Sequence, residues 1–184
     1  MTGKAGAPQA EAPREPAIVT DLRTRFPDSI EGLSNFRGQL TIRVRNEAIG
    51  AVCRYLRDAA DWRFDMLADL CGVDMLRLRA APRFDVIYHL YSVAHNRRLR
   101  LKAAVDEWGS IESVTPIWPG ANWQEREAYD MFGIVFDGHP DLRRILLPDD
   151  WHEYPLRKDI VQEGDRLEAD RWLSRQGIPV RLTE

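Results

Sequence analysis

The most constraining feature of this sequence lies between residues 123 and 159, where a polar helical pattern gives way to a segment interrupted by prolines. After Gly133, no regular spacing of apolar residues continues. Pro140, Pro148 and Pro155 forbid a continuous helix because proline lacks the N–H donor, and they confine any strand to a sheet edge. Since such a segment cannot bury an apolar face of its own, the sequence predicts that something else orders it.

The composition is that of an ordinary globular domain. The chain has 184 residues, of which 44% are apolar and 30% charged, and its formal net charge is −3. This charge gives no electrostatic basis for binding nucleic acid. The apolar runs are too short to span a bilayer, and the first sixteen residues contain no apolar core of a secretory signal.

Cysteine is sparse, with only Cys53 and Cys71 and no CxxC pair. This usage excludes a disulfide framework, a four-cysteine zinc site and an iron–sulfur cluster held by this chain alone. We interpret both cysteines as small residues on partly buried faces, and we expect a reducing, cytosolic setting.

The pattern along the chain predicts an α+β fold, with a mostly antiparallel sheet, helices on one face and an extended C-terminal tail. The expected elements are a helix from Ile18 that ends before Pro27, a strand at 38–45, a helix at 46–60 with Asn46 as its N-cap, strands at 84–91 and 98–103 that form a hairpin, and a strand at 114–118. Residues 64–76 are compatible with either a strand or a helix. We predict a disordered arm at 1–17, a globular domain at 18–137 and a partner-wrapping tail at 138–184.

A further helix is expected just before the proline-rich segment. Asn122 is the predicted N-cap, Glu125 completes a capping box, and Gly133 fits the left-handed position after the helix. Arg126 and Asp130 lie one turn apart and are expected to pair. A last short helix, capped by Asp165, is predicted to end near Gln176.

Acidic and histidine side chains in this region could supply a general acid and base or bind a metal, and they suggest a free-standing enzyme as one hypothesis. These residues are Glu125, Glu127, Asp130, His139, Asp141 and His152. Their spacing matches no HExxH or comparable ligand pair, no GxSxG occurs, and the glycines do not cluster into a phosphate loop. The sequence therefore predicts no catalytic, cofactor-binding or metal-binding residues in this chain.

Paired basic residues at 143–144 and 157–158 are flanked by acids, as on a solvated charged face, and these acids would repel a polyanion. Large apolar and aromatic side chains alternate with them, which favours a protein interface. The predicted partner-binding residues are Glu125, Arg126, Glu127, Asp130, Phe132, His139, Leu142, Arg143, Arg144, Leu146, Trp151, Leu156, Arg157 and Lys158.

The same region carries a family resemblance. The runs Glu125-Arg126-Glu127, Tyr129 to Ile134, Gly138 to Leu146 and Pro155 to Asp159 are similar to the signature of the C subunit of the bacterial NADH–quinone oxidoreductase, the counterpart of the thirty-kilodalton subunit of mitochondrial complex I. Two departures are Glu153-Tyr154, where the family usually has glycine and histidine, and Ile160, where an aromatic residue is frequent.

The resemblance implies a subunit without a redox centre in the hydrophilic arm of a proton-pumping complex. In this family, electrons pass from NADH through FMN and iron–sulfur clusters in partner subunits to quinone. The tail runs over the D subunit, which forms the quinone site with the B subunit, and the I subunit is a further expected partner. Attachment to the cytoplasmic side of the inner cell membrane is expected only through the complex. The alternative is the equivalent subunit of a membrane-bound hydrogenase or of a complex that oxidises ferredoxin or a deazaflavin.

Overall fold

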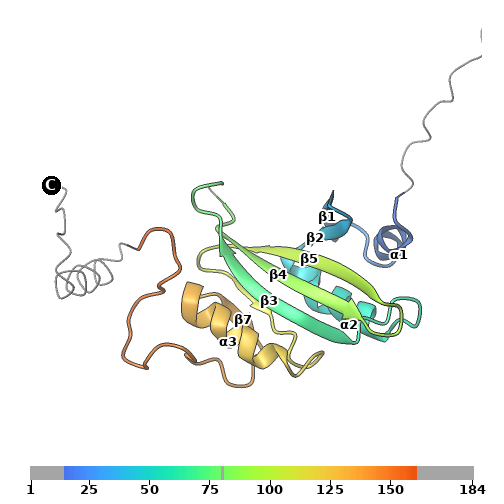
Figure 1. The fold of residues 1–184 in the computed structure, drawn as a ribbon. Helices are drawn as coiled ribbons and strands as arrows, with labels where there is room; N and C mark the ends of the chain where they lie inside the picture. Colours follow the sequence, from blue (N-terminus) through green and yellow to red (C-terminus); the bar gives the residue numbers. More distant parts are fainter. Residues whose placement is uncertain (1–14, 80, 161–184) are drawn as a thin grey trace, which may run out of the picture.

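The computed structural model describes residues 15–79 and 81–160 (Figure 1). In chain order, the elements are α1 (Ala17–Arg25), β1 (Ile30–Phe36), β2 (Gln39–Val44), the 3-10 helix η1 (Asn46–Ala48), α2 (Ile49–Asp58), β3 (Met66–Asp74), β4 (Phe84–Ser92), β5 (Arg97–Val105), β6 (Ser110–Glu112), α3 (Ala121–Phe132) and β7 (Val135–Asp137). None of the helices in the described ranges has the length and apolar character needed to cross a bilayer.

The main sheet has five strands in the order β1-β2-β5-β4-β3. All neighbours are antiparallel except β2 and β5, which pair in parallel. The short strands β6 and β7 form a separate parallel pair. The predicted α+β fold with a mostly antiparallel sheet is confirmed.

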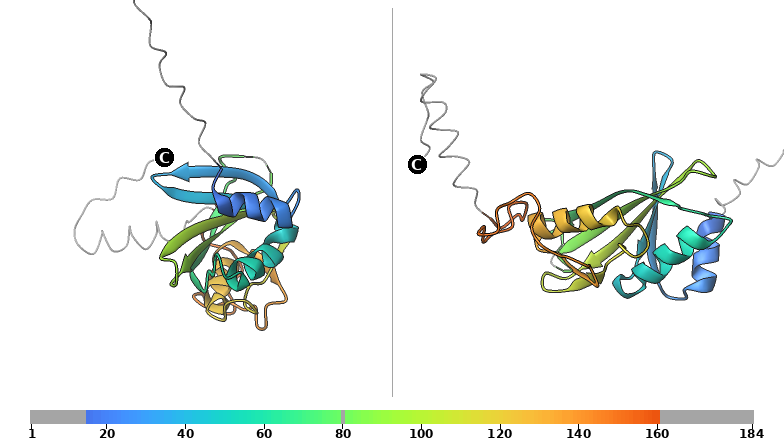
Figure 2. Two further views of the ribbon diagram at one scale, coloured as in Figure 1. Left: turned by 90° about the vertical axis from the view of Figure 1, so that its right-hand side faces the viewer. Right: turned by 90° about the horizontal axis from the view of Figure 1, so that it is seen from below.

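The core lies between one face of the sheet and the helices. On β4, Phe84, Val86, Tyr88 and Leu90 alternate toward this face and are buried, as their spacing predicts. The amphipathic helix α2 covers them with the stripe of Val52, Cys53 and Leu56. Views along two further directions show α2 and α3 on the same side of the sheet, so the opposite face carries no helix of the described chain (Figure 2).

One predicted strand is wrong and three real strands are missed. Residues 114–118 form a tight turn, in which the N–H groups of Ile117 and Trp118 both donate to the carbonyl of Val114. The side chains of Ile117 and Trp118 are buried although the chain turns here. The apolar residues that this burial requires gave the pattern that predicted a strand. The missed strands are β1, which is largely exposed and lacks a clear alternation, and β6 and β7, which have only three residues each.

Asn46 does not cap the second helix. It begins η1, and its side-chain amide donates to the carbonyl of Ser110 at 2.7 Å, while α2 starts three residues later, at Ile49. The ambiguous segment at 64–76 is the strand β3. The first helix begins at Ala17, inside the predicted arm, whereas residues 1–14 and the helix expected after Asp165 lie outside the described residues.

Residues 138–160, called the tail segment below, contain no helix or strand. They run beside α3 and return toward the β3 edge of the sheet, drawn in orange in Figure 1. The lack of regular structure agrees with the prolines in the sequence. The tail segment lies against its own domain, and the contacts described below hold it there.

Candidate subunit interface

Helix α3 carries five of the fourteen predicted partner-binding residues, but it begins differently from the prediction. It starts at Ala121 after Gly120, with no side-chain cap, so the predicted N-cap at Asn122 is wrong. Glu125 does not turn back to the helix start. Its fully buried carboxylate accepts hydrogen bonds from Ser113 Oγ at 2.6 Å and from the N–H of Val114 at 2.7 Å. Glu125 therefore fixes the turn before α3.

The C-terminal end of α3 follows the prediction. Gly133 has φ 75°, in the left-handed region that glycine tolerates best. A Cβ built there would lie 2.6 Å from the ring of Tyr154, so the tail segment adds a second, steric reason for glycine. Any larger residue would have to move the side chains of Tyr154 and Arg157 as well as strain the backbone.

Asp130 holds the tail segment with four hydrogen bonds. Its Oδ2 accepts from the successive N–H groups of Ile145, Leu146 and Leu147 at 3.0, 2.7 and 2.9 Å. Its Oδ1 accepts from Arg144 Nη1 at 2.6 Å. Burial alone would raise the pKa of this carboxyl, but the N–H groups and the guanidinium hold it below its ordinary value. Asp130 is therefore a buried anion that orders irregular backbone.

Arg126 complements Asp130 by binding carbonyl groups of the same backbone. Its Nε donates to the carbonyl of Arg143 at 3.0 Å and its Nη2 to that of Arg144 at 2.8 Å. The predicted pair between Arg126 and Asp130 is thus wrong, since each side chain is turned to the tail segment instead. We call Arg126, Asp130 and the backbone of residues 143–147 the polar clamp.

His139 lies between the tail segment and the start of α3. Its Nδ1 accepts from the N–H of Asp141 at 3.0 Å, which leaves the proton on Nε2, where it faces the carbonyl of Asn122 at 3.2 Å. The side chains of His139 and Glu125 lie 4.0 Å apart and neither is exposed to solvent. Since both ring nitrogens engage backbone groups, this pair offers no accessible base to a substrate.

A second set of contacts fixes the end of the tail segment to the main domain. Arg83, almost fully buried, forms ion pairs with Asp74 at 3.0 Å and with Asp159 at 2.6 Å. The Asp74 carboxylate also accepts from the N–H of Lys158 at 2.8 Å. We call Arg83, Asp74 and Asp159 the arginine anchor. It joins residues 76 positions apart, and no local pattern in the sequence predicts a role for Asp74 or Arg83 in this contact.

Arg157 packs beside the arginine anchor and binds the end of α3. Its Nε donates to the carbonyl of Phe132 at 2.6 Å, and its guanidinium lies 4.6 Å from the ring centre of Tyr154 and 5.3 Å from that of Phe84. Burial lowers the pKa of this guanidinium from its ordinary value, and the aromatic faces offer a compensating attraction. Arg157 is therefore a structural residue within this chain.

The predicted partner-binding residues divide into two groups. One group is engaged inside the chain, by hydrogen bonds or by packing on the core: Glu125, Arg126, Asp130, Phe132, His139, Leu142, Arg144 and Arg157. The other group is exposed: Glu127, Arg143, Leu146, Trp151, Leu156 and Lys158. The structure thus separates residues that shape the tail segment from residues that it presents to solvent.

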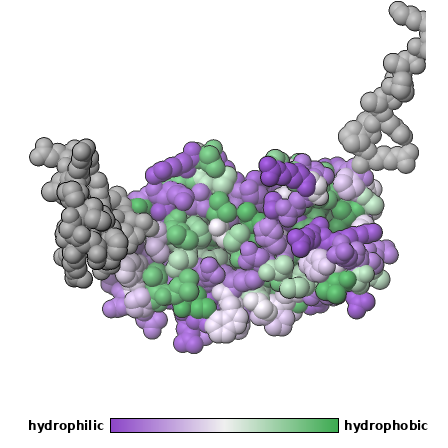
Figure 3. All heavy atoms as spheres, viewed as in Figure 1, coloured by the Kyte–Doolittle hydropathy of each residue, from purple (hydrophilic) through white to green (hydrophobic). Residues whose placement is uncertain are grey.

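Large apolar side chains are exposed along this surface. The exposed fractions are 63% for Trp123 on α3 and 62%, 45% and 46% for Leu146, Trp151 and Leu156 on the tail segment. Figure 3 shows apolar residues interspersed with hydrophilic ones over the side of the molecule where α3 and the tail segment lie. We call these four residues the apolar anchors, because side chains of this kind carry binding energy when a partner buries them.

Glu125 makes the stability of this region depend on pH. Burial raises its pKa from about 4.5 to about 7, so the folded chain prefers the protonated carboxyl. The contribution of the protonated Glu125 carboxyl to the free energy of unfolding is fully present below about pH 4.5. It is lost as the pH rises to about 7, a total decrease of about 3 kcal/mol. We expect Glu125→Gln to reduce this loss, as measured by urea unfolding between pH 5 and pH 8. Glu127→Gln, on the exposed side of α3, is the matched control. Parallel pH profiles for wild type and Glu125→Gln would contradict the assignment.

The chain is similar in sequence to one protein family and in fold to a solved structure. The family model described as "Respiratory-chain NADH dehydrogenase, 30 Kd subunit" matches residues 42–166, a range that includes α3 and the whole tail segment. Among solved structures, a chain of the membrane-bound sulfane sulfur reductase, an archaeal respiratory membrane complex, has a TM-score of 0.66 at 23% identity and covers 91% of this chain and 94% of its own length. That similarity concerns the fold.

Three curated relatives, each named as the C subunit of an NADH-quinone oxidoreductase, are similar over most of their length. The protein of Roseiflexus sp. (strain RS-1) is 51% identical over 78% of this chain and 82% of its own. That of Geotalea uraniireducens (strain Rf4) is 46% identical over 79% and 87%, and that of Caulobacter vibrioides 48% over 89% and 83%. By the matched range and these identities, the chain belongs to the family of the respiratory-chain NADH dehydrogenase 30 kDa subunit, which is the C subunit of bacterial NADH-quinone oxidoreductases.

Proposed function

We propose that this chain is a structural subunit of a proton-translocating NADH-quinone oxidoreductase, with no redox cofactor and no active site of its own. Its role is to bind a neighbouring subunit of the hydrophilic arm through the tail segment. By analogy with the family, that neighbour is the D subunit, close to the quinone site that the D and B subunits form, and the I subunit lies within reach. FMN and the iron–sulfur clusters reside in other subunits, and the chain meets the cytoplasmic side of the membrane only through the complex.

The observation that carries the proposal is that exposed apolar anchors project from backbone that buried polar groups hold in place. Leu146 is exposed while its own N–H is bound by Asp130, so the side chain is presented from a fixed position. A surface ordered before binding loses less conformational entropy on association than a free tail does. Exposed apolar side chains with arginines among them are typical of sites that bind other proteins.

Arg143 and Arg144 are adjacent but have different environments, and this difference gives a direct test. The Arg143 side chain is 68% exposed and its ion pair among the described residues is with Asp141 at 2.9 Å, whereas Arg144 is 12% exposed and binds Asp130. We expect Arg143→Ala to leave the stability of the purified chain within about 0.5 kcal/mol of wild type, because surface ion pairs contribute little. Its affinity for the complex should fall by roughly tenfold or more, as for an arginine at a binding hot spot.

The measurement is the recovery of the intact complex on native gels after the variant subunit replaces the wild type, together with thermal unfolding of the purified chain. Arg54→Ala, on the exposed side of α2 with a similar surface ion pair, is the matched control and should assemble normally. Arg144→Ala should lower both stability and assembly, since it leaves Asp130 without its cation. Full recovery of the complex with Arg143→Ala would contradict its place in the interface. Mass spectrometry of the recovered complex also tells an NADH-quinone oxidoreductase from a related membrane-bound complex.

A further inference from the structure

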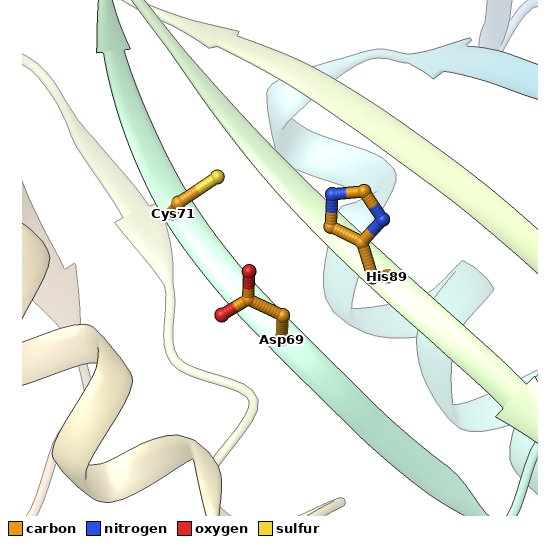
Figure 4. Close-up of side chains that lie close together, drawn as sticks. All are labelled: Asp69, Cys71 and His89. Carbon is orange, nitrogen blue, oxygen red and sulfur yellow. The ribbon is translucent and has the colours of Figure 1, made fainter.

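The face of the main sheet opposite the helices brings together three side chains that can bind a metal ion. Asp69 and Cys71 are two positions apart on β3, so their side chains leave the same face of the strand. His89, on the neighbouring strand β4, is directly opposite Asp69 in the ladder and diagonal to Cys71. Figure 4 shows the three side chains projecting together from these two strands.

Their distances are compatible with one shared ion. A carboxylate oxygen of Asp69, Sγ of Cys71 and a ring nitrogen of His89 all lie within 4.8 Å of one another. Bonds of about 2.0 to 2.3 Å in a tetrahedral site place ligand atoms about 3.5 Å apart, so modest side-chain rotations close the site. Within the described part of the chain, no hydrogen bond or ion pair engages these three side chains, so rotation breaks no existing contact.

The donor set selects the class of ion. A thiolate, an imidazole and a carboxylate suit Zn²⁺ and its chemical relatives, whereas Mg²⁺ and Ca²⁺ require oxygen ligands. Thiolate and carboxylate together supply two negative charges, which balance a divalent cation. Arg100 stands opposite His89 on β5 and donates to Gln39 Oε1 at 2.6 Å, and its positive charge lies close enough to act on both His89 and Cys71.

We propose that Asp69, Cys71 and His89 form a site for a zinc-class divalent cation, with water completing the coordination on the open side of the sheet. On binding, the S–H bond of Cys71 breaks, its proton passes to solvent, and the sulfur bonds the metal with no change of oxidation state. The bound ion links the edge strand β3 to β4. This inference departs from the sequence expectation of no metal site, because the pairing of β3 with β4, and not local spacing, assembles the ligands. It does not depend on the proposed docking function.

Titration of the full-length chain, free of any affinity tag, with Co²⁺ tests the site, since cobalt replaces zinc and gives a thiolate-to-cobalt absorption band only when sulfur is bound. We expect this band to saturate at one equivalent of Co²⁺ and to disappear when Zn²⁺ is added. Cys71→Ser should abolish the band, and His89→Gln should weaken Co²⁺ binding at least about tenfold, because even the supporting residues of metal sites have effects of that size.

The other cysteine provides the matched control. Cys53 lies on the core-facing side of α2, on the other face of the sheet from Asp69 and His89, so Cys53→Ala should keep the band and the affinity. Circular dichroism confirms that each variant is folded. The proposal is overturned if wild-type protein shows no band at saturating Co²⁺, or if the band survives in Cys71→Ser and is lost in Cys53→Ala.

Discussion

Replacing Asp130 with alanine should release the tail segment from α3 while the main sheet stays folded. The substitution removes the carboxylate that accepts from three backbone N–H groups and leaves the Arg144 guanidinium with backbone carbonyls but no anion. Removing one partner of a buried charged network costs about 3 to 5 kcal/mol. The tail segment has no regular structure and can solvate these groups by detaching, so the cost should appear as local opening and not as global unfolding.

Limited proteolysis measures this opening, because cleavage of a transiently exposed segment follows the population of its open form. A cost of about 3 kcal/mol corresponds to a rise of roughly 100-fold in the rate of cleavage between residues 138 and 160. Asp141→Ala is the matched control, since this aspartate lies in the same segment and its side chain forms an exposed ion pair with Arg143. Equal cleavage rates in the two variants would show that the polar clamp does not hold the segment.

Replacing Arg83 with alanine should destabilise the main domain itself. Asp74 is fully buried at the end of β3, and Arg83 is the cation that balances it. Within the described residues, the substitution leaves the buried Asp74 carboxylate with the N–H groups of Leu76 and Lys158 as its donors, at a cost of about 3 to 5 kcal/mol. For a chain of this size, the thermal midpoint should fall by at least about 6 °C.

Calorimetry or circular dichroism at neutral pH records this shift, and Arg77→Ala, an exposed arginine of the same loop, serves as the control. Asp159→Ala, which removes the half-exposed partner of Arg83, should cost far less. A double-mutant cycle between Arg83 and Asp159 then gives the energy with which the arginine anchor holds the tail segment. A melting point unchanged by Arg83→Ala would mean that Asp74 does not need this cation.

Sequence patterns predict those parts of the fold that local physics determines. The hairpin of β4 and β5 follows from the alternation of the sequence over residues 84–91 and 98–103, and the end of α3 follows from the backbone freedom of Gly133. By contrast, the apolar pattern at 114–118 predicts a strand where the chain turns, because burial of Val114 and Ile117 comes from packing against other elements and not from a sheet. The parallel pairing of β2 with β5 also has no local signature.

The region of the candidate interface can be selected from the sequence, but the contacts of its residues require the structure. One-turn spacing predicts that Asp130 pairs with Arg126, yet its actual partners include backbone N–H groups fifteen to seventeen positions further along the chain. Nearly every residue type has a backbone N–H, so no sequence pattern marks the residues whose N–H groups bind Asp130. The arginine anchor depends on the register that sets Asp74 against Phe84, beside Arg83, and this register is a property of the assembled sheet.

The charged side chains of the polar clamp also affect the chain during its synthesis, before it meets its partners. Asp130 and Arg126 bind backbone that is made later in synthesis, so the unfinished chain presents a carboxylate and a guanidinium on this side of α3. Water solvates both groups well, whereas an apolar stripe in the same place would promote aggregation of the nascent chain. The charged contacts between α3 and the tail segment therefore add no apolar surface to that which the apolar anchors already expose.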